Sequence, residues 1–96
     1  MSLTYVLSPM AEADLEDIWV YTAETWSAEQ AEIYTNDIID IFEKLAEGQK
    51  KGRPVEVREG YLKALVGRHA IYFLVRSDVI AIVRVLHQSM DVELHL

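Results

Sequence analysis

The sequence predicts an α+β fold, in which one strand precedes a hairpin of two helices and an antiparallel sheet of three to four strands follows. Three observations support this prediction. Alternating apolar residues open the chain, two helical periods with capping residues follow, and nearly everything after residue 54 consists of strand-forming residues. The expected order is β-α-α-β-β-β with a short C-terminal tail.

Apolar residues at positions 3, 5 and 7 indicate a short first strand. Ser8 and Pro9 then supply an N-cap and a proline at the first helical position, and Glu12 is expected to complete a capping box. The acidic side chains of this helix, Asp14 among them, are expected on its exposed side. The apolar face is expected to carry Ala11, Leu15, Ile18, Trp19, Thr22 and Trp26, the two tryptophans packing in the core or anchoring the helical hairpin.

A second helix is predicted to begin at once, because Ser27 and Gln30 repeat the capping pattern. Its buried face is expected to consist of Ala31, Tyr34, Ile38, Ile41, Phe42 and Leu45. Gly48 is expected to end the helix. Residues 49–54 are predicted to be a polar connector without regular structure, because Gly52 and Pro54 interrupt it.

Strands are predicted at residues 55–57, 61–66, 68–76 and 79–86, with turns at Gly67 and at residues 77–78. The run 79–86 is almost wholly apolar, so we expect it in the middle of the sheet with the helices on one side. Tyr72 and Phe73 are adjacent, so one of them is expected to point away from the helices unless the strand bulges. Arg84 interrupts the apolar run, and its guanidinium must therefore reach water, an acid or a ligand.

Composition narrows the class of protein. Residues 1–96 are expected to form one domain, since this length leaves no room for a second core. The absence of cysteine excludes disulfides, thiolate metal sites and cysteine nucleophiles. No signal peptide, bilayer-spanning run or phosphate-binding glycine pattern is evident, so we expect a cytoplasmic protein without a membrane association or nucleotide cofactor.

Charge divides the chain into two halves. Up to Glu47 there are eleven acidic residues and one lysine, a net charge of −10, whereas the remainder carries eight basic and five acidic residues, a net charge of +3. The two halves are expected to contact partners of opposite character, unless the acidic helices serve only solubility.

Several segments occur in an order that is typical of one known family. They are residues 11–15 with Ile18 and Tyr21, then Trp26, residues 30–31, Tyr34, residues 58–61, 67–69, 71–73 and 82–88, Met90, Asp91 and residues 95–96. Together they resemble the ParE toxins of bacterial toxin–antitoxin systems, over essentially the whole chain. The resemblance implies the RelE/ParE fold, a ParD-type antitoxin that forms a hetero-oligomer with the toxin, and a role in plasmid or chromosomal stability.

Characterised members of this family poison DNA gyrase, and the resemblance assigns DNA binding to the antitoxin, so no direct contact with nucleic acid is expected. The related RelE toxins cleave messenger RNA at the ribosome, which is the alternative function. A third alternative is a toxin that binds its antitoxin but has lost toxicity.

Cleavage of RNA needs a base, an acid and a cation beside the phosphate. The last strand offers Arg84, His87 and Gln88, no tyrosine follows Tyr72, and the net charge of −7 disfavours binding to a polyanion. We therefore expect a binding toxin without catalytic residues. His87, Asp91 and His95 are four residues apart and would share a helical face, but no second shell is evident and no metal is expected.

Two groups of residues are predicted to contact partners. The first is a cationic and aromatic face expected to bind an acidic, apolar segment of the antitoxin, and it comprises Arg58, Tyr61, Arg68, Tyr72 and Arg84. The second is expected to face the target or to belong to the family pattern, and it comprises His69, His87, Gln88 and Asp91.

Overall fold

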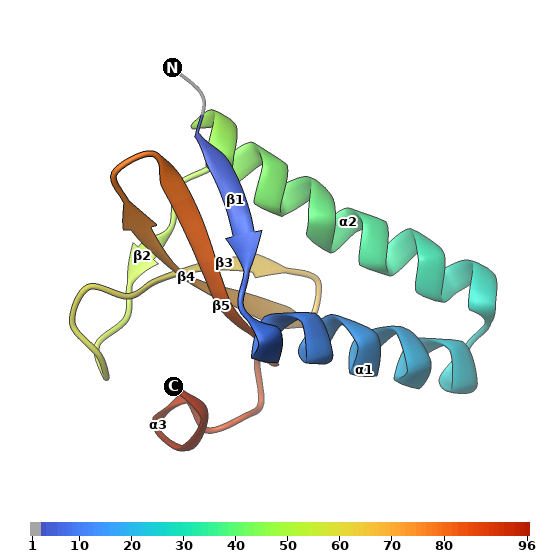
Figure 1. Ribbon diagram of the computed structural model, residues 1–96. Helices are drawn as coiled ribbons and strands as arrows, with labels where there is room; N and C mark the ends of the chain where they lie inside the picture. Colours follow the sequence, from blue (N-terminus) through green and yellow to red (C-terminus); the bar gives the residue numbers. More distant parts are fainter. Residues whose placement is uncertain (1–2) are drawn as a thin grey trace.

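The computed structural model describes residues 3–96 and places the helical hairpin against one face of a five-stranded sheet (Figure 1). In chain order the elements are β1 (Thr4–Leu7), α1 (Pro9–Thr25), α2 (Ala28–Glu47), β2 (Arg53–Pro54), β3 (Leu62–Val66), β4 (His69–Arg76), β5 (Val79–His87) and α3 (Val92–His95). This order confirms the predicted α+β fold.

The sheet is larger and more mixed than the sequence indicated. Its strand order is β1-β5-β4-β3-β2, and β1 runs parallel to β5 with Thr4 opposite Val79 and Leu7 opposite Ile82. The other neighbouring strands are antiparallel. Because β1 covers one edge of β5 and β4 the other, the apolar strand β5 lies inside the sheet, as predicted.

Both helices begin at the expected serines. The hydroxyl of Ser8 accepts a hydrogen bond from the N–H of Ala11, and the hydroxyl of Ser27 accepts one from Gln30, each at 3.0 Å. The expected role of Glu12 in a capping box is wrong, because Ala11 occupies the third helical position and the N–H of Ser8 already donates to Ile82 in β5 at 2.9 Å. The helix α2 ends at Gly48, whose φ of 79° is left-handed.

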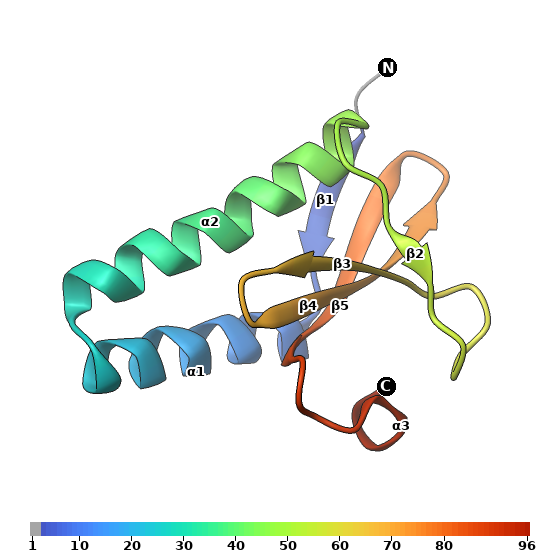
Figure 2. The same ribbon diagram turned by 180° about the vertical axis from the view of Figure 1, so that it is seen from behind.

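The main core lies between the helices and the sheet. Its fully buried large side chains are Ile38 and Phe42 from α2 and Ile71, Phe73 and Ile82 from the sheet. A second, smaller cluster lies on the opposite face of the sheet. There Ala70, Tyr72 and Leu86 are covered by Val55 and by Val92 and Leu96 of the C-terminal segment, which Figure 2 shows apart from the two long helices.

The strand predicted at residues 55–57 is wrong, and so is the core alternative for the two tryptophans, whereas their alternative as anchors of the helical hairpin stays a prediction. Residues 55–57 form no strand; instead Arg53 and Pro54 pair with Lys63 and Leu62 at the sheet edge, where a proline without an N–H is tolerated. Trp26 is not a core residue, since it is 72% exposed just beyond the end of α1. Trp19 is partly buried but belongs to neither cluster.

No helix within residues 3–96 is both long enough and apolar enough to cross a bilayer.

Candidate functional site

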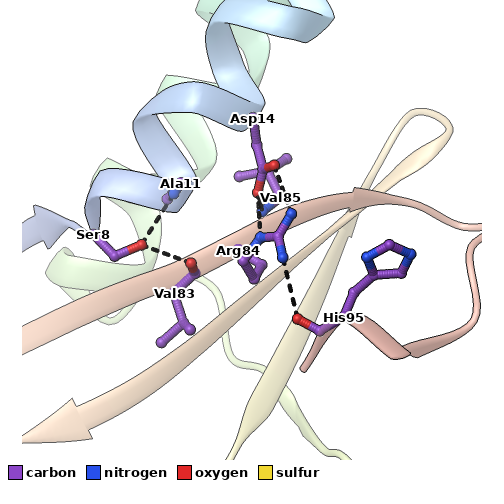
Figure 3. A network of polar contacts seen from close by, with 7 residues as sticks. All are labelled: Ser8, Ala11, Asp14, Val83, Arg84, Val85 and His95. Carbon is purple, nitrogen blue, oxygen red and sulfur yellow. Dashed lines mark hydrogen bonds and ion pairs between the residues drawn. The ribbon is translucent and has the colours of Figure 1, made fainter. Parts of the chain in front are cut away.

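The only arginine of β5 is held by a carboxylate from the first helix (Figure 3). The Nε and Nη2 atoms of Arg84 donate to the two carboxylate oxygens of Asp14 at 2.8 and 2.9 Å. Both side chains are largely buried, with 13% and 12% of their surfaces exposed. This hydrogen-bonded pairing raises the pKa of Arg84, against the opposing effect of desolvation. Arg84 thus reaches an acid, one of the three outcomes its sequence context allowed.

The expectation that Asp14 lies on the exposed side of α1 is wrong. Asp14 follows the buried Ala11 by three residues and precedes the buried Ile18 by four, so it shares their face of the helix. This spacing was the available signal for the partner of Arg84. An acid on a buried helix face and an arginine in a buried strand each need a partner of opposite charge.

Asp14 and Ser8 also supply hydrogen bonds to the backbone of β5 where no neighbouring strand is present to supply them. The strand β1 ends at Leu7, while β5 continues to His87 past a bulge at Val83, where Tyr72 pairs with Arg84 and Phe73 pairs with Ile82. Beyond β1, the hydroxyl of Ser8 donates to the carbonyl of Val83 at 2.7 Å, and the N–H of Val85 donates to Asp14 at 2.9 Å (Figure 3). Backbone groups that would otherwise be buried without a partner are therefore satisfied.

Four of the five residues predicted to bind the antitoxin lie around the C-terminal segment. Arg84 donates from Nη1 to the carbonyl of His95 at 3.2 Å, and Arg58 donates to the carbonyl of Leu96. The guanidinium of Arg58 lies 4.9 Å from the ring centre of Tyr61. Tyr72 points away from the hairpin, as the alternation allowed, and is 3% exposed beneath Val92 and Leu96. We call this region, with residues 92–96, the C-terminal face.

A pocket of about 380 Å³ opens beside the C-terminal face. Its lining includes Tyr72 and Val92 together with the cations Arg53 and Lys63 and the acid Glu56. Burial raises the pKa of the Tyr72 hydroxyl, so this group stays protonated at neutral pH. The lining therefore combines apolar side chains with two cations and one carboxylate.

Arg68, the fifth residue, lies elsewhere, in the turn between β3 and β4. There it lines a second pocket, of about 750 Å³, between this turn and the connection of α1 to α2. His69 and His87 line the same space, and their rings pack edge to face with centres 5.2 Å apart. We call it the hairpin pocket. Its helical wall includes the aromatic residues Tyr21, Trp26 and Tyr34.

The residues predicted to face the target are only partly brought together. His69 and His87 meet in the hairpin pocket, and the amide of Gln88 donates to the carbonyl of Gly67 in the adjoining turn at 3.0 Å. Asp91 is separate from them, since its carboxylate accepts a hydrogen bond from Glu93 at the start of α3. Among residues 3–96, no three His, Asp or Glu side chains are placed to hold one metal ion.

The hydroxyl of Tyr34 organises the floor of the hairpin pocket. It accepts a hydrogen bond from the N–H of Arg68 at 3.0 Å and lies 2.6 Å from Nδ1 of His69. Burial is the main cause that raises the pKa of Tyr34. Burial, together with the neighbouring His87, lowers the pKa of His69 to about 4, so this imidazole is neutral at pH 7.

Comparison with known proteins identifies the family. Residues 5–92 match the family model described as the ParE toxin of type II toxin–antitoxin system, parDE. The chain belongs to the ParE toxin family.

Relatives of ParE type are similar along their whole length. The Toxin ParE1 proteins of two Mycobacterium tuberculosis strains, CDC 1551 and H37Rv, are each 41% identical over 98 residues, which covers 100% of both chains. Toxin ParE1 of Caulobacter vibrioides CB 15 is 42% identical over 93 residues, covering 96% of each chain. The chain is therefore a ParE-type toxin of a type II toxin–antitoxin system.

Solved structures share the fold of this ParE-type chain. A chain from the chromosomal ParDE system of P. aeruginosa superposes with a TM-score of 0.80 at 23% identity, covering 90% of this chain and 96% of that one. A chain of the Mycobacterium tuberculosis toxin–antitoxin complex RelBE2 gives a TM-score of 0.65 at 19% identity, with 91% and 99% coverage. At these identities the likeness shows the fold alone, and it confirms the RelE/ParE fold predicted from the sequence.

Replacing Asp14 tests its role in the fold. Asp14→Ala leaves the guanidinium of Arg84 and the N–H of Val85 without their partner, so we expect a loss of about 3 kcal/mol in the free energy of unfolding in urea. Asp17→Ala, an exposed change on the same helix, is expected to stay within about 0.5 kcal/mol of the wild type.

A double-mutant cycle makes this test specific. Asp14→Ala combined with Arg84→Met is expected to destabilise by clearly less than the sum of the single changes, since the two side chains share one interaction. Strict additivity of the two changes would contradict the assigned pairing.

The low pKa of His69 predicts a pH-dependent stability. Between pH 6.5 and about 4 the unfolded chain binds a proton on this ring that the folded chain does not bind, so the free energy of unfolding falls as the pH drops through this window. With allowance for partial exposure of the ring, the loss amounts to about 1–2 kcal/mol.

Urea denaturation at pH 7 and pH 4.5 measures this loss. His69→Gln should remove that part of the pH dependence, whereas His95→Gln, an exposed change, should keep it. Equal pH profiles for the wild type and His69→Gln would show that the ring titrates normally.

Proposed function

We propose that this ParE-type toxin acts by binding DNA gyrase, without breaking a covalent bond, and that a ParD-type antitoxin neutralises it through the C-terminal face. The observation that carries the proposal is the pairing of Arg84 with Asp14. A cation serving a phosphate in RNA cleavage must be free to contact it, and Arg84 is engaged by a carboxylate on one side and a carbonyl on the other.

Two of the three histidines also lie away from this cation, while His95 contacts Arg84 through its backbone carbonyl and is exposed near the end of the C-terminal segment. His69 and His87 line the hairpin pocket, whereas Arg84 contacts α1 and the C-terminal segment. General acid–base catalysis requires such groups within hydrogen-bonding reach of one reacting phosphate. The hairpin pocket does bring Arg68 beside these two histidines, but it offers a single cation for the charge of a phosphate. The arrangement therefore supports a toxin that binds a protein better than one that cleaves RNA.

The proposed contact with the antitoxin rests on the composition of the C-terminal face. The exposed Arg58 and Arg53, with Lys63, lie around the partly buried Val55 and Val92, which cover Tyr72. Arg84 contributes by holding the C-terminal segment in place, because its guanidinium is already engaged by Asp14 and His95. An antitoxin segment that alternates acidic and apolar residues complements this surface in both charge and hydrophobicity. The choice of gyrase as target rests on the family resemblance, in which characterised members poison that enzyme.

Two activity assays on one preparation test the proposed mode of action. Purified toxin is expected to inhibit DNA supercoiling by gyrase and to leave transcripts on translating ribosomes intact. Cleavage of messenger RNA by the same preparation, without inhibition of gyrase, would favour the RelE-like function instead. If the preparation neither inhibits gyrase nor cleaves messenger RNA, the chain has lost its toxicity.

The antitoxin contact is tested in the same assay. Adding the cognate antitoxin should restore supercoiling, and Arg58→Glu should raise the antitoxin concentration required by about tenfold or more, because a charge on the C-terminal face is reversed. Arg76→Glu provides a matched control, since Arg76 is an exposed arginine at the far end of β4. An equal response of the two variants would remove Arg58 from the contact.

A further inference from the structure

The hairpin pocket has an aromatic outer wall and an inner wall of N–H donors, and neither takes part in the proposed contact with the antitoxin. Its outer wall is formed by aromatic side chains that are largely exposed, Tyr21 at 68% and Trp26 at 72%. Tyr21 lies in the last turns of α1 and Trp26 is its C-cap, and this end of the helical hairpin extends past the sheet (Figures 1 and 2). Exposed aromatic residues beside a concave surface are typical of protein-binding sites.

The inner wall offers N–H donors. The Nδ1 atom of His87 accepts a hydrogen bond from the backbone N–H of Ser89 at 3.1 Å, so in the neutral ring the proton resides on Nε2. The hydroxyl of Tyr34 lies 2.6 Å from Nδ1 of His69 but 3.4 Å from the carbonyl of Val66, so it donates to the imidazole, which again leaves the proton on Nε2. Among residues 3–96, neither Nε2 atom has a hydrogen-bonding partner.

The charge of the hairpin pocket is opposite to that of its surroundings. It contains Arg68 and no carboxylate, although its helical wall belongs to the half of the chain with a net charge of −10. Within residues 3–96, the guanidinium of Arg68 has no ion-pair partner. The helix α2 begins at this rim with Ser27 and Gln30, and the positive end of its dipole adds to the cationic character.

The inner wall is held in place before any ligand arrives. Gly67 has a φ of 54°, and a Cβ atom at this position would lie 2.6 Å from the ring of Tyr34. The ring of Tyr34 therefore packs directly on the turn that carries Arg68 and His69, and its hydroxyl bonds to both residues. Such a preorganised site loses little entropy on binding.

We propose that the hairpin pocket holds a carboxylate that its protein target carries beside an aromatic or aliphatic side chain. This inference rests on the proposed function and specifies which part of the toxin contacts the target. The N–H donors of Arg68, His69 and His87 receive the carboxylate, and Tyr21 and Trp26 cover its apolar neighbour. A nucleic acid fits less well, because binding to its backbone takes several cations and the hairpin pocket has one.

Titration with small probes tests the chemistry of the hairpin pocket on the unmodified protein. N-acetylphenylalanine carries a carboxylate beside an aromatic ring, and N-acetylphenylalanine amide is its neutral control. We expect the acid to shift the NMR signals of the Trp26 indole N–H and of the Arg68 and His69 amides, with an affinity about tenfold above that of the amide. Equal shifts from both probes, or shifts confined to other residues, would overturn the proposal.

Adenosine monophosphate provides the phosphate arm of the same titration. Saturation of these signals by the nucleotide at a lower concentration than by the acid would overturn the assignment to a protein carboxylate. Weaker binding of the nucleotide would support it.

A growth assay then connects the hairpin pocket to toxicity. Trp26→Ala should reduce toxicity in a host without the antitoxin by about tenfold, while its affinity for the antitoxin stays unchanged. Ile33→Ala is the matched control, because Ile33 is 49% exposed on α2 outside this pocket. Full toxicity of Trp26→Ala would overturn the inference. A wild-type chain without toxicity would refute the proposed function instead, and the titration would still decide the chemistry of the hairpin pocket.

Discussion

The arrangement of the helices, the sheet and the C-terminal segment depends on the contacts made by the carboxylate of Asp14. It accepts hydrogen bonds from Arg84 and from the backbone of Val85, and it thereby fixes α1 against β5 where the neighbouring strand β1 has ended. Through Arg84 the same contact extends to the carbonyl of His95 in the C-terminal segment. One buried ion pair therefore links the helical hairpin, the central strand and the tail that covers Tyr72.

Local chemistry made most of the fold predictable. The capping serines, the period of α2, its end at Gly48 and the turn at Gly67 are signals contained within a few residues. The parallel pairing of β1 with β5 connects residues 75 positions apart, and no local pattern specifies it. The edge strand at Arg53 and Pro54 was missed for a related reason, because its only support is the pairing with β3.

The candidate site was predictable in its residue types more than in its geometry. Arg58, Tyr61, Tyr72 and Arg84 were assigned to one face, and the structure gathers them, but under a C-terminal segment whose cover the sequence did not indicate. The apolar period of α1 predicts that Trp26 packs in the core or anchors the helical hairpin, and the core alternative fails because the helix ends at Thr25 and leaves Trp26 exposed. The hairpin pocket forms only when that end meets the turn before β4, so its aromatic wall had no sequence signal.

The toxin as proposed has two separate protein-binding surfaces, one at the C-terminal face and one at the hairpin pocket. Amide hydrogen exchange of the toxin, alone and saturated with its antitoxin, tests this separation most directly. We expect the antitoxin to slow exchange in residues 53–63 and 92–96 and to leave the rates of residues 21–34 and 67–69 unchanged. Slower exchange confined to residues 21–34 and 67–69 would contradict this expectation, because the antitoxin would then occupy the surface assigned to the target.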